Sequence, residues 1–205
     1  MTLDRFTITV FCGSASGSDP LYPATARAVG AAIARHGMSL VYGGGHVGLM
    51  GAVADAALAG GAHVTGVIPR ALQAREAVHD DVSELVLVDS MHERKTIMSD
   101  RADAFLALPG GPGTLEELTE QWTWAQLGIH EKPSGILNVD GYFDPLLAFV
   151  GNMRDRGFTH PRYTDMLVVS DQIDDALERL RDYVPPPRVA SSPGAEMSVA
   201  EPLRA

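Results

Sequence analysis

Cysteine and lysine are both scarce in this chain of 205 residues, and each scarcity excludes a class of protein. Cys12 is the single cysteine, so no disulfide can form within the chain, and no Cys/His cluster has the spacing of a zinc site. The only lysines are Lys95 and Lys132, and the net charge is −10. So acidic a chain repels nucleic-acid backbones, which argues against a polynucleotide ligand and leaves small anionic ligands open.

Long apolar stretches are also missing, since no run approaches the roughly 20 residues that span a bilayer. Residues 1–14 reach the first apolar run without a basic leader or a small-residue cleavage site. We therefore expect a cytoplasmic protein with no membrane partner. Hydrophobic residues make up 45% of the chain, which is ordinary for a globular protein with one sizeable core.

Short apolar runs alternate with helical stretches along the chain, which is typical of an α/β protein. The predicted strands are residues 6–11, 39–43, 63–69, 84–89, 103–109, 134–139 and 166–171. Continuously apolar strands are buried on both faces. We therefore predict a single Rossmann-like, doubly wound domain over residues 1–183, with a mostly parallel sheet and helices on both faces. Residues 184–205, rich in proline and small residues, are predicted to form a flexible C-terminal tail.

Three predicted strands are each followed by a glycine-rich turn, over residues 12–17, 42–51 and 109–114. In a doubly wound sheet such turns meet at the carboxyl ends of the strands, where ligands bind. Glycine lets backbone N–H groups approach an anion, and a helix that begins after the turn adds free N–H donors. Three such turns at one edge predict a phosphate-bearing ligand.

The fingerprint of dinucleotide-binding proteins is not met, although Gly43, Gly45 and Gly48 match G-x-G-x-x-G by letter. The match follows the second predicted strand, and residues 63–69 offer no acidic side chain for a ribose hydroxyl. A G-x-x-x-x-G-K-[ST] phosphate loop is missing too. A mononucleotide therefore fits better than NAD or ATP.

Glu117 has a structural and a functional interpretation. Thr114 and Glu117 spell T-x-x-E, a capping box in which Thr114 would cap a helix and Glu117 would reach back to it. A carboxylate in the first turn of a phosphate-binding helix would also lie within reach of a bound ribose. The two roles do not exclude each other.

Arg94 and Arg101 fall on the apolar side of the helix predicted over residues 91–102, where a surface helix would place leucine. A buried guanidinium needs a carboxylate or phosphate partner. We expect an internal ion pair for Arg101. For Arg94, an ion pair and a ligand contact are equally supported.

The histidines carry little signal. Four of them lie at element ends or in loops, where we expect surface positions: His36, His63, His79 and His160. His46 and His92 lie near the glycine-rich turns but show no pairing typical of metal ligands, so no metal site is predicted.

Two tryptophans indicate two apolar faces on one predicted helix. Trp122 shares a face with Leu115 and Leu118, which predicts a core position. Trp124 and Leu127 lie on another face, which is better explained by a subunit interface than by a cofactor site.

Together, the motifs YGGGHVGLMG (42–51), MHERK (91–95) and PGGPGTLEE (109–117) resemble those of the Lonely Guy family of cytokinin riboside 5′-monophosphate phosphoribohydrolases. The resemblance runs from about residue 6 to residue 183. It implies hydrolysis of the N-glycosidic bond of N6-modified AMP to a free cytokinin base and ribose 5-phosphate, without a metal or organic cofactor. It also implies a homodimer or larger assembly.

The resemblance assigns the family's catalytic pair to Arg94 and Glu117. Its nucleotide contacts correspond to Glu76, Arg94, Lys95, Gly111, Pro112, Gly113, Thr114, Leu115, Glu116, Glu117 and Thr123. From the glycine-rich turns we add the substrate-binding residues Gly13, Ser14, Gly44, Gly45 and Gly110. Because cleavage of a ribosyl C1′–N bond builds positive charge on the sugar, Glu117 would stabilise that charge, orient a hydroxyl or activate water. Arg94 would anchor phosphate or ribose and fix the carboxylate.

Three other functions share features of this sequence. A lysine decarboxylase, a label that related sequences have carried, needs a Schiff-base lysine, for which neither Lys95 nor Lys132 is suitably placed. A general AMP or 5′-nucleotide nucleosidase would use the same residues. A molybdenum-cofactor carrier has similar architecture, but the intact pair of Arg94 and Glu117 favours an enzyme. We expect residues 70–83 and a second subunit to line the pocket for an isoprenoid side chain.

Overall fold

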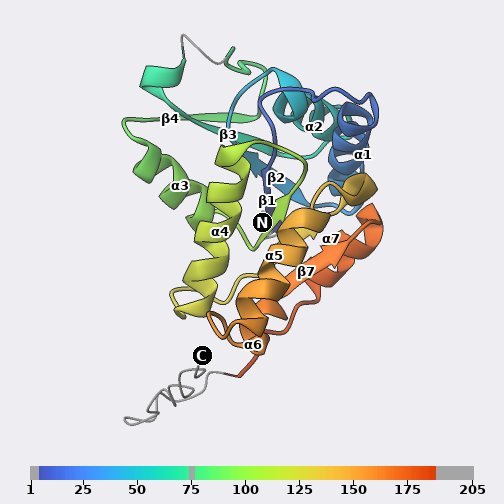
Figure 1. Cartoon of the computed structure of the whole chain (residues 1–205). Helices are drawn as coiled ribbons and strands as arrows, with labels where there is room; N and C mark the ends of the chain where they lie inside the picture. Colours follow the sequence, from blue (N-terminus) through green and yellow to red (C-terminus); the bar gives the residue numbers. More distant parts are fainter. Residues whose placement is uncertain (1–4, 74–76, 188–205) are drawn as a thin grey trace, which may run out of the picture.

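The seven apolar runs of the sequence form the strands of one parallel sheet in the computed structural model, which describes residues 5–73 and 77–187 (Figure 1). The strands are β1 (Thr7–Phe11), β2 (Ser39–Tyr42), β3 (Val64–Pro69), β4 (Glu84–Val88), β5 (Ala104–Ala107), β6 (Ser134–Leu137) and β7 (Leu167–Ser170). Each lies within its predicted range, so the predicted doubly wound α/β fold is confirmed.

Helices connect the strands on both faces of the sheet. They are α1 (Leu21–Arg35), α2 (Gly48–Ala59), α3 (Met91–Asp100), α4 (Pro112–Gln126), α5 (Asp144–Asp155), α6 (Pro161–Thr164) and α7 (Ile173–Arg181). Two short 3-10 turns are η1 (Arg70–Leu72) and η2 (Val139–Gly141). None of these described helices is long and apolar enough to cross a bilayer.

The strand order is β4-β3-β2-β1-β5-β6-β7, and every neighbouring pair is parallel. From β1 the chain moves outward through β2 and β3 to β4, and then returns to the other side of β1 as β5. The connections after β1 and β5 therefore run in opposite directions. Such a switch point opens a crevice at the carboxyl ends of the strands, where doubly wound proteins bind ligands.

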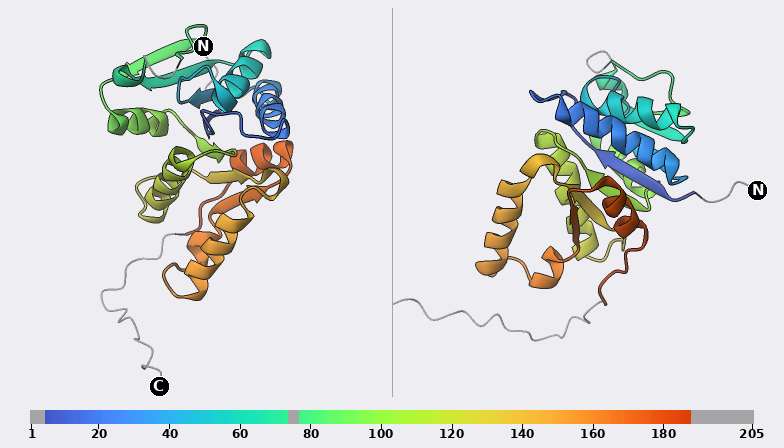
Figure 2. Two further views of the ribbon diagram at one scale, coloured as in Figure 1. Left: turned by 45° about the horizontal axis from the view of Figure 1, so that its top comes forward. Right: turned by 90° about the vertical axis from the view of Figure 1, so that its right-hand side faces the viewer.

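Alternating residues of the strands build two separate cores. On β1, Ile8 and Val10 join the core beneath α1, α2 and α7, whereas Phe11 joins the core beneath α3, α4 and α5. Figures 1 and 2 show these two groups of helices on opposite sides of the sheet. The buried polar side chain of β1 on the second face, Thr9, is satisfied, because its hydroxyl donates to the Met98 carbonyl at 3.0 Å. Continuous apolar runs are thus used on both faces, as predicted.

A third apolar cluster extends the core beside α4. Trp122 packs there with Val150 and Met166, and its indole Nε1 donates to the Tyr163 carbonyl at 2.7 Å. The predicted core position of Trp122 is confirmed, and Leu118 is buried as well. Leu115, predicted on the same face, is exposed instead, in the first turn of α4.

Part of the sequence lies outside the described residues. Residues 184–187 have no regular structure, and the rest of the predicted tail, from residue 188, is not described. Glu76, predicted to contact the nucleotide, falls in the second undescribed segment, residues 74–76. The flexible tail and the nucleotide contact of Glu76 therefore stay predictions.

Gly30 allows α1 and α2 to pack closely. A Cβ atom at this position would collide with the Val53 carbonyl and lie 2.9 Å from the Ala57 nitrogen, both in the backbone of α2. Gly151 on α5 is a matched contrast, because a Cβ there would meet nothing within 4 Å.

We predict opposite effects of alanine at these two helical glycines. Gly30→Ala should lower the free energy of unfolding by about 1–3 kcal/mol, because the helices must move apart. Gly151→Ala should raise it by up to about 1 kcal/mol, because alanine has the higher helix propensity. Urea unfolding of both variants measures this, and stabilisation by both substitutions would contradict the close helix contact.

Candidate active site

Backbone hydrogen bonds join the three glycine-rich turns at the switch point. The Gly13 N–H donates to the Pro109 carbonyl at 3.1 Å, which connects the turns after β1 and β5. The Leu49 N–H donates to the Gly13 carbonyl at 3.0 Å, which adds the turn after β2. The prediction that these turns meet at one edge is confirmed.

Some of the glycines are explained by this close approach. A Cβ at Gly110 would lie 2.8 Å from the Gly13 nitrogen, and a Cβ at Gly48 would collide with the backbone of Ser14. Gly48 also has a φ of +67°, which favours glycine. These residues are needed for the contact between turns, whether or not a ligand binds.

Gly111 and Gly113 have no such explanation. A Cβ at either position would meet nothing within 4 Å. Both are exposed, at the N-terminus of α4, and neither has a positive φ. Packing therefore does not require glycine here, whereas close approach of a ligand to the backbone would.

The predicted capping box at Thr114 is wrong. The helix begins at Pro112, with Gly111 as the N-cap residue and no side-chain cap, so Thr114 is the third helical residue and Glu117 lies in the second turn. Proline accounts for the shift, because its fixed φ suits the first helical position. The N–H groups of Gly113 and Thr114 lack an intrahelical acceptor by helix geometry, and with no side-chain cap they are available to an anion.

Glu117 lies near the end of β1. It is half-buried, and its negative charge acts on Cys12, the first residue after that strand. Burial first, and then the Glu117 charge, raise the pKa of the Cys12 thiol far above its ordinary value. The Glu117 carboxylate is therefore close to the turn that contains Gly13.

Arg94 is buried beside the second turn. It lies on α3, and a capping box stabilises the N-terminus of this helix. The Glu93 N–H donates to Ser90 Oγ, and the Asp89 N–H donates to Glu93 Oε2. The capping box predicted for α4 is thus found on α3 instead. The Arg94 side chain is 6% exposed. Its Nη2 donates to the Gly43 carbonyl at 2.8 Å, and its buried Nε has no hydrogen-bond partner among the described residues.

Gly43 is explained by Arg94, because a Cβ at this position would collide with the guanidinium. The first glycine of the GGG sequence thus makes room for the buried cation. The other terminal nitrogen, Nη1, lies 3.7 Å from Met91 Sδ, and the buried positive charge attracts an anion.

The second arginine of the helix behaves differently. Arg101 forms the expected ion pair, with both guanidinium nitrogens on Glu84 at 2.5 and 2.8 Å. The pair is not internal, however, since both side chains are about 40% exposed at the end of α3. Met91, the first residue of α3, is also exposed. Both residues lie at the ends of the helix, where it leaves the sheet.

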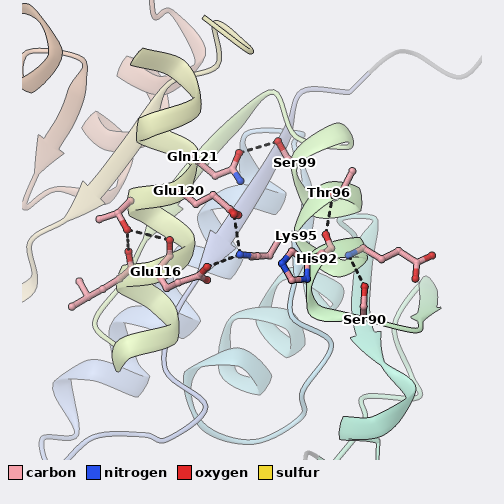
Figure 3. Close-up of polar contacts among 11 residues, drawn as sticks. Ser90, His92, Lys95, Thr96, Ser99, Glu116, Glu120 and Gln121 are labelled. Atoms are coloured by element: carbon pink, nitrogen blue, oxygen red, sulfur yellow. Dashed lines mark hydrogen bonds and ion pairs between the residues drawn. The ribbon is translucent and has the colours of Figure 1, made fainter. Parts of the chain in front are cut away.

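A row of polar contacts holds α3 against α4 (Figure 3). Lys95 reaches from α3 to Glu116 at 2.5 Å and to Glu120 at 2.9 Å. Partial burial alone would lower the pKa of Lys95, but the two carboxylates outweigh it and raise that pKa. One turn further along, the Ser99 hydroxyl donates to Gln121 Oε1 at 2.9 Å. These contacts set the spacing between the helices that carry Arg94 and Glu117.

Some of the remaining predicted site residues lie in the glycine-rich turns, and one lies far from them. Ser14 is exposed in the first turn. Gly44 and Gly45 are buried, with the Gly44 carbonyl accepting from the His79 N–H at 3.1 Å and Gly45 forming a β-bridge with Val78. Thr123 is exposed and follows Pro112 by 11 residues, or about 16 Å along the helix, so this chain does not bring it to the glycine-rich turns.

His79 contradicts its predicted surface position. It is 2% exposed, and its Nε2 lies 2.8 Å from Asp55 Oδ1. The prediction is wrong because the segment after η1 returns to the glycine-rich turn, as the bridge between Gly45 and Val78 shows. Sequence periodicity contains no signal for this contact.

Comparison with known proteins gives consistent matches over most of the chain. A family model described as "Possible lysine decarboxylase" matches residues 50–180. A probable cytokinin riboside 5′-monophosphate phosphoribohydrolase from Oryza sativa subsp. japonica is 48% identical over 192 residues, which cover 93% of this chain and 78% of the relative. A cytokinin riboside 5′-monophosphate phosphoribohydrolase from Arabidopsis thaliana is 45% identical over 213 aligned positions, which cover 97% of this chain and 98% of the relative.

Solved structures share the fold at lower identity. The molybdenum cofactor binding protein from Rippkaea orientalis matches with a TM-score of 0.66 and 22% identity, covering 88% of this chain and 98% of that one. The molybdenum cofactor carrier protein from Chlamydomonas reinhardtii matches with a TM-score of 0.64 and 21% identity, covering 86% and 96%. These likenesses concern the fold alone.

His130 completes the contact between α3 and α4 on the side away from the glycine-rich turns. Its Nδ1 accepts from the Lys132 N–H at 3.2 Å, and its Nε2 lies 3.2 Å from Gln121 Oε1. Both ring nitrogens are therefore used by the neutral imidazole. Burial first, and then the positive charge of Lys132, lower the pKa of His130 to about 4.

This lowered pKa predicts a pH dependence of stability. Between about pH 6.5 and pH 4 the unfolded chain binds a proton at His130 that the folded chain does not, so the free energy of unfolding should fall as the pH falls. In His130→Gln this slope should decrease by up to one proton, while His63→Gln, an exposed control, should keep it. Urea unfolding across this pH range measures the slope. An unchanged slope in His130→Gln would contradict the prediction.

Proposed function

The chain belongs to the family of cytokinin riboside 5′-monophosphate phosphoribohydrolases, and on that premise we propose that it hydrolyses the N-glycosidic bond of N6-modified AMP. The products are a free cytokinin base and ribose 5-phosphate. The observation that supports this most is the buried guanidinium of Arg94, which contacts the second of three joined glycine-rich turns through the Gly43 carbonyl and keeps Nε without a described hydrogen-bond partner. Such a cation needs an anion, and the 5′-phosphate or the ribose-binding carboxylate supplies it.

The 5′-phosphate binds at the N-terminus of α4 in this proposal. The N–H groups of Gly113 and Thr114 point along the helix axis toward it, and the Thr114 hydroxyl adds a donor. Exposed Gly111 and Gly113, which packing does not require, leave room for the phosphate oxygens. Gly13, Ser14 and the turn after β2 close the other side.

Glu117 acts on the sugar. As the C1′–N9 bond breaks, its electron pair leaves with the purine and positive charge develops on the ribose ring. The Glu117 carboxylate stabilises that charge and takes a proton from the water that adds to C1′, while the departing purine takes up a proton from solvent to become the free base. Arg94 fixes the carboxylate and the phosphate relative to each other, and the polar contacts of Lys95 hold the two helices at the required spacing. Direct contacts of Lys95 and Glu116 with the nucleotide stay predictions, since their charges are paired with each other.

A pyridoxal-dependent decarboxylase does not fit this chain. A Schiff-base lysine reacts as the neutral amine, but the carboxylates around Lys95 raise its pKa and favour the charged form. Lys132 donates to the Ser99 carbonyl at 2.7 Å, beneath the contact between α3 and α4 and away from the glycine-rich turns. Neither lysine is placed for cofactor chemistry.

We also propose a homodimer in which α4 contributes to the interface. Leu127 is 71% exposed and Ile129 62% exposed, beside half-buried Trp124 at the end of this helix. Exposed Thr123 lies on the same part of α4, so a second copy would bring it to a substrate. Residues 70–83 and that copy would then line the pocket for the N6 substituent. The cytoplasmic location expected from the sequence stays a prediction.

The reaction is tested with isopentenyladenosine 5′-monophosphate and AMP, with released base measured by chromatography. We expect faster release from the modified nucleotide. Glu117→Gln should lower kcat by about 100-fold or more while substrate binding persists, because a general base is lost. Glu178→Gln, the same change on exposed α7, should have no effect.

Each other outcome has a definite meaning. A wild-type rate in Glu117→Gln would remove Glu117 from the mechanism. Equal release from AMP would indicate a general 5′-monophosphate nucleosidase. Binding of both nucleotides without release would favour a carrier.

The dimer predicts a specific effect of charge at Leu127. Leu127→Asp should convert the protein to a monomer in light scattering coupled to size-exclusion chromatography, because a buried carboxylate opposes association. Phe158→Asp, at an even more exposed apolar residue after α5, should leave the dimer intact. A monomeric wild type, or a dimer that persists in Leu127→Asp, would contradict this interface.

A further inference from the structure

Three potential metal ligands meet behind the second glycine-rich turn, outside the groups used in the proposed reaction. They are His46 in that turn, Asp55 on α2 and His79 in the segment before β4, and their ligand atoms all lie within 4.8 Å of one another. The sequence predicts no ligand pairing for His46 and does not identify this cluster. The sequence hides the cluster because its members are 9 and 24 residues apart, in three different elements.

The distances converge on one carboxylate oxygen. His79 Nε2 lies 2.8 Å from Asp55 Oδ1, and His46 Nε2 lies 3.7 Å from the same atom. Ligand atoms of a tetrahedral zinc ion lie about 3.4 Å apart, so these two distances bracket the value for a shared ion. The two imidazole rings are stacked, with centroids 4.1 Å apart and planes 24° apart.

Hydrogen bonding explains only part of this arrangement. It accounts for the contact between His79 and Asp55, but the His46 ring is held at a distance too long for a hydrogen bond to the same oxygen. Buried His79 also keeps Nδ1 without a hydrogen-bond partner among the described residues. Two imidazole nitrogens and one carboxylate oxygen gathered within 4.8 Å of one another are donors that a divalent metal ion can share.

The exposure of the cluster suits an ion that enters from solvent. The His79 side chain is 2% exposed and lies at the buried side of the cluster. The side chains of His46 and Asp55 are about half exposed, so the other side of the cluster is open to water. The charge of the chain is −10, which favours cations in general. Two imidazoles and one carboxylate suit zinc and similar borderline divalent ions, whereas Mg²⁺ and Ca²⁺ prefer oxygen ligands.

We propose that His46, Asp55 and His79 form a binding site for a divalent transition-metal ion of the zinc class, with water completing the coordination. The ion replaces the hydrogen bond between His79 Nε2 and Asp55 Oδ1, and His79 binds it through Nε2 as a neutral imidazole that keeps its ring proton on Nδ1. The site is structural: it ties residues 77–79 and α2 to the GGG turn, whose Gly43 carbonyl holds Arg94. It does not depend on the proposed reaction.

The test uses zinc chloride as the probe on metal-free full-length protein. Competition with a chromophoric zinc chelator measures affinity and stoichiometry, and thermal unfolding with and without zinc gives a second readout. We expect one equivalent of bound zinc and a higher unfolding midpoint, because the ion binds the folded chain. Magnesium chloride at the same concentration should neither displace bound zinc nor raise the unfolding midpoint.

Two variants locate the ion. His46→Ala removes an exposed ligand without disturbing the core, and should weaken zinc binding by about tenfold or more and remove the thermal shift. His63→Ala is the matched control, because His63 is equally exposed and lies 3.9 Å from a single carboxylate, Glu84. It should bind zinc as the wild type does.

Either of two results would overturn the proposal. One is the absence of zinc binding to the wild type at micromolar concentrations. The other is equal zinc affinity in His46→Ala and the wild type, which would place the ion elsewhere.

Discussion

The buried guanidinium of Arg94 is the constraint on which the site depends. Removing a charge from water costs several kcal/mol, so the surrounding structure must supply acceptors and an anion. Here the Gly43 carbonyl supplies one acceptor at 2.8 Å, and the absence of a side chain at Gly43 supplies the space. The capping box at Ser90 fixes the start of α3, and Lys95 ties that helix to α4. Each of these features serves to hold one cation beside the switch point of the sheet.

The glycines of the site separate into two kinds once the backbone is known. Gly43, Gly48 and Gly110 are required because another side chain, or another turn, occupies the place of a Cβ. Gly111 and Gly113 border open space at an uncapped helix N-terminus. Gly43, Gly48 and Gly110 allow the turns to pack together at the edge of the sheet. Gly111 and Gly113 leave that edge accessible to solvent, so only these two directly support a ligand.

Much of this was predictable from the sequence because it follows from local patterns. Continuous apolar runs gave the strand ranges, and glycine-rich turns after them gave the edge at which the site lies. What failed was nonlocal or depended on one boundary residue. Pro112 started α4 earlier than the T-x-x-E pattern indicated, and the capping box formed at Ser90 instead. His79 is buried because its neighbour Val78 forms a β-bridge with Gly45, a contact for which sequence spacing has no signal. Thr123 is distant from the turns because α4 already begins at Pro112, 11 residues earlier.

The central claim is that Arg94 and the N-terminus of α4 together form an anion site for the 5′-phosphate. Calorimetric titration of Glu117→Gln with AMP and with adenosine tests it directly, because this variant is expected to bind without turnover. Charge-assisted hydrogen bonds contribute about 1.5–3 kcal/mol, so AMP should bind at least about tenfold more tightly than adenosine. Equal affinity for the two would contradict the account, because the buried guanidinium would then have no phosphate to bind.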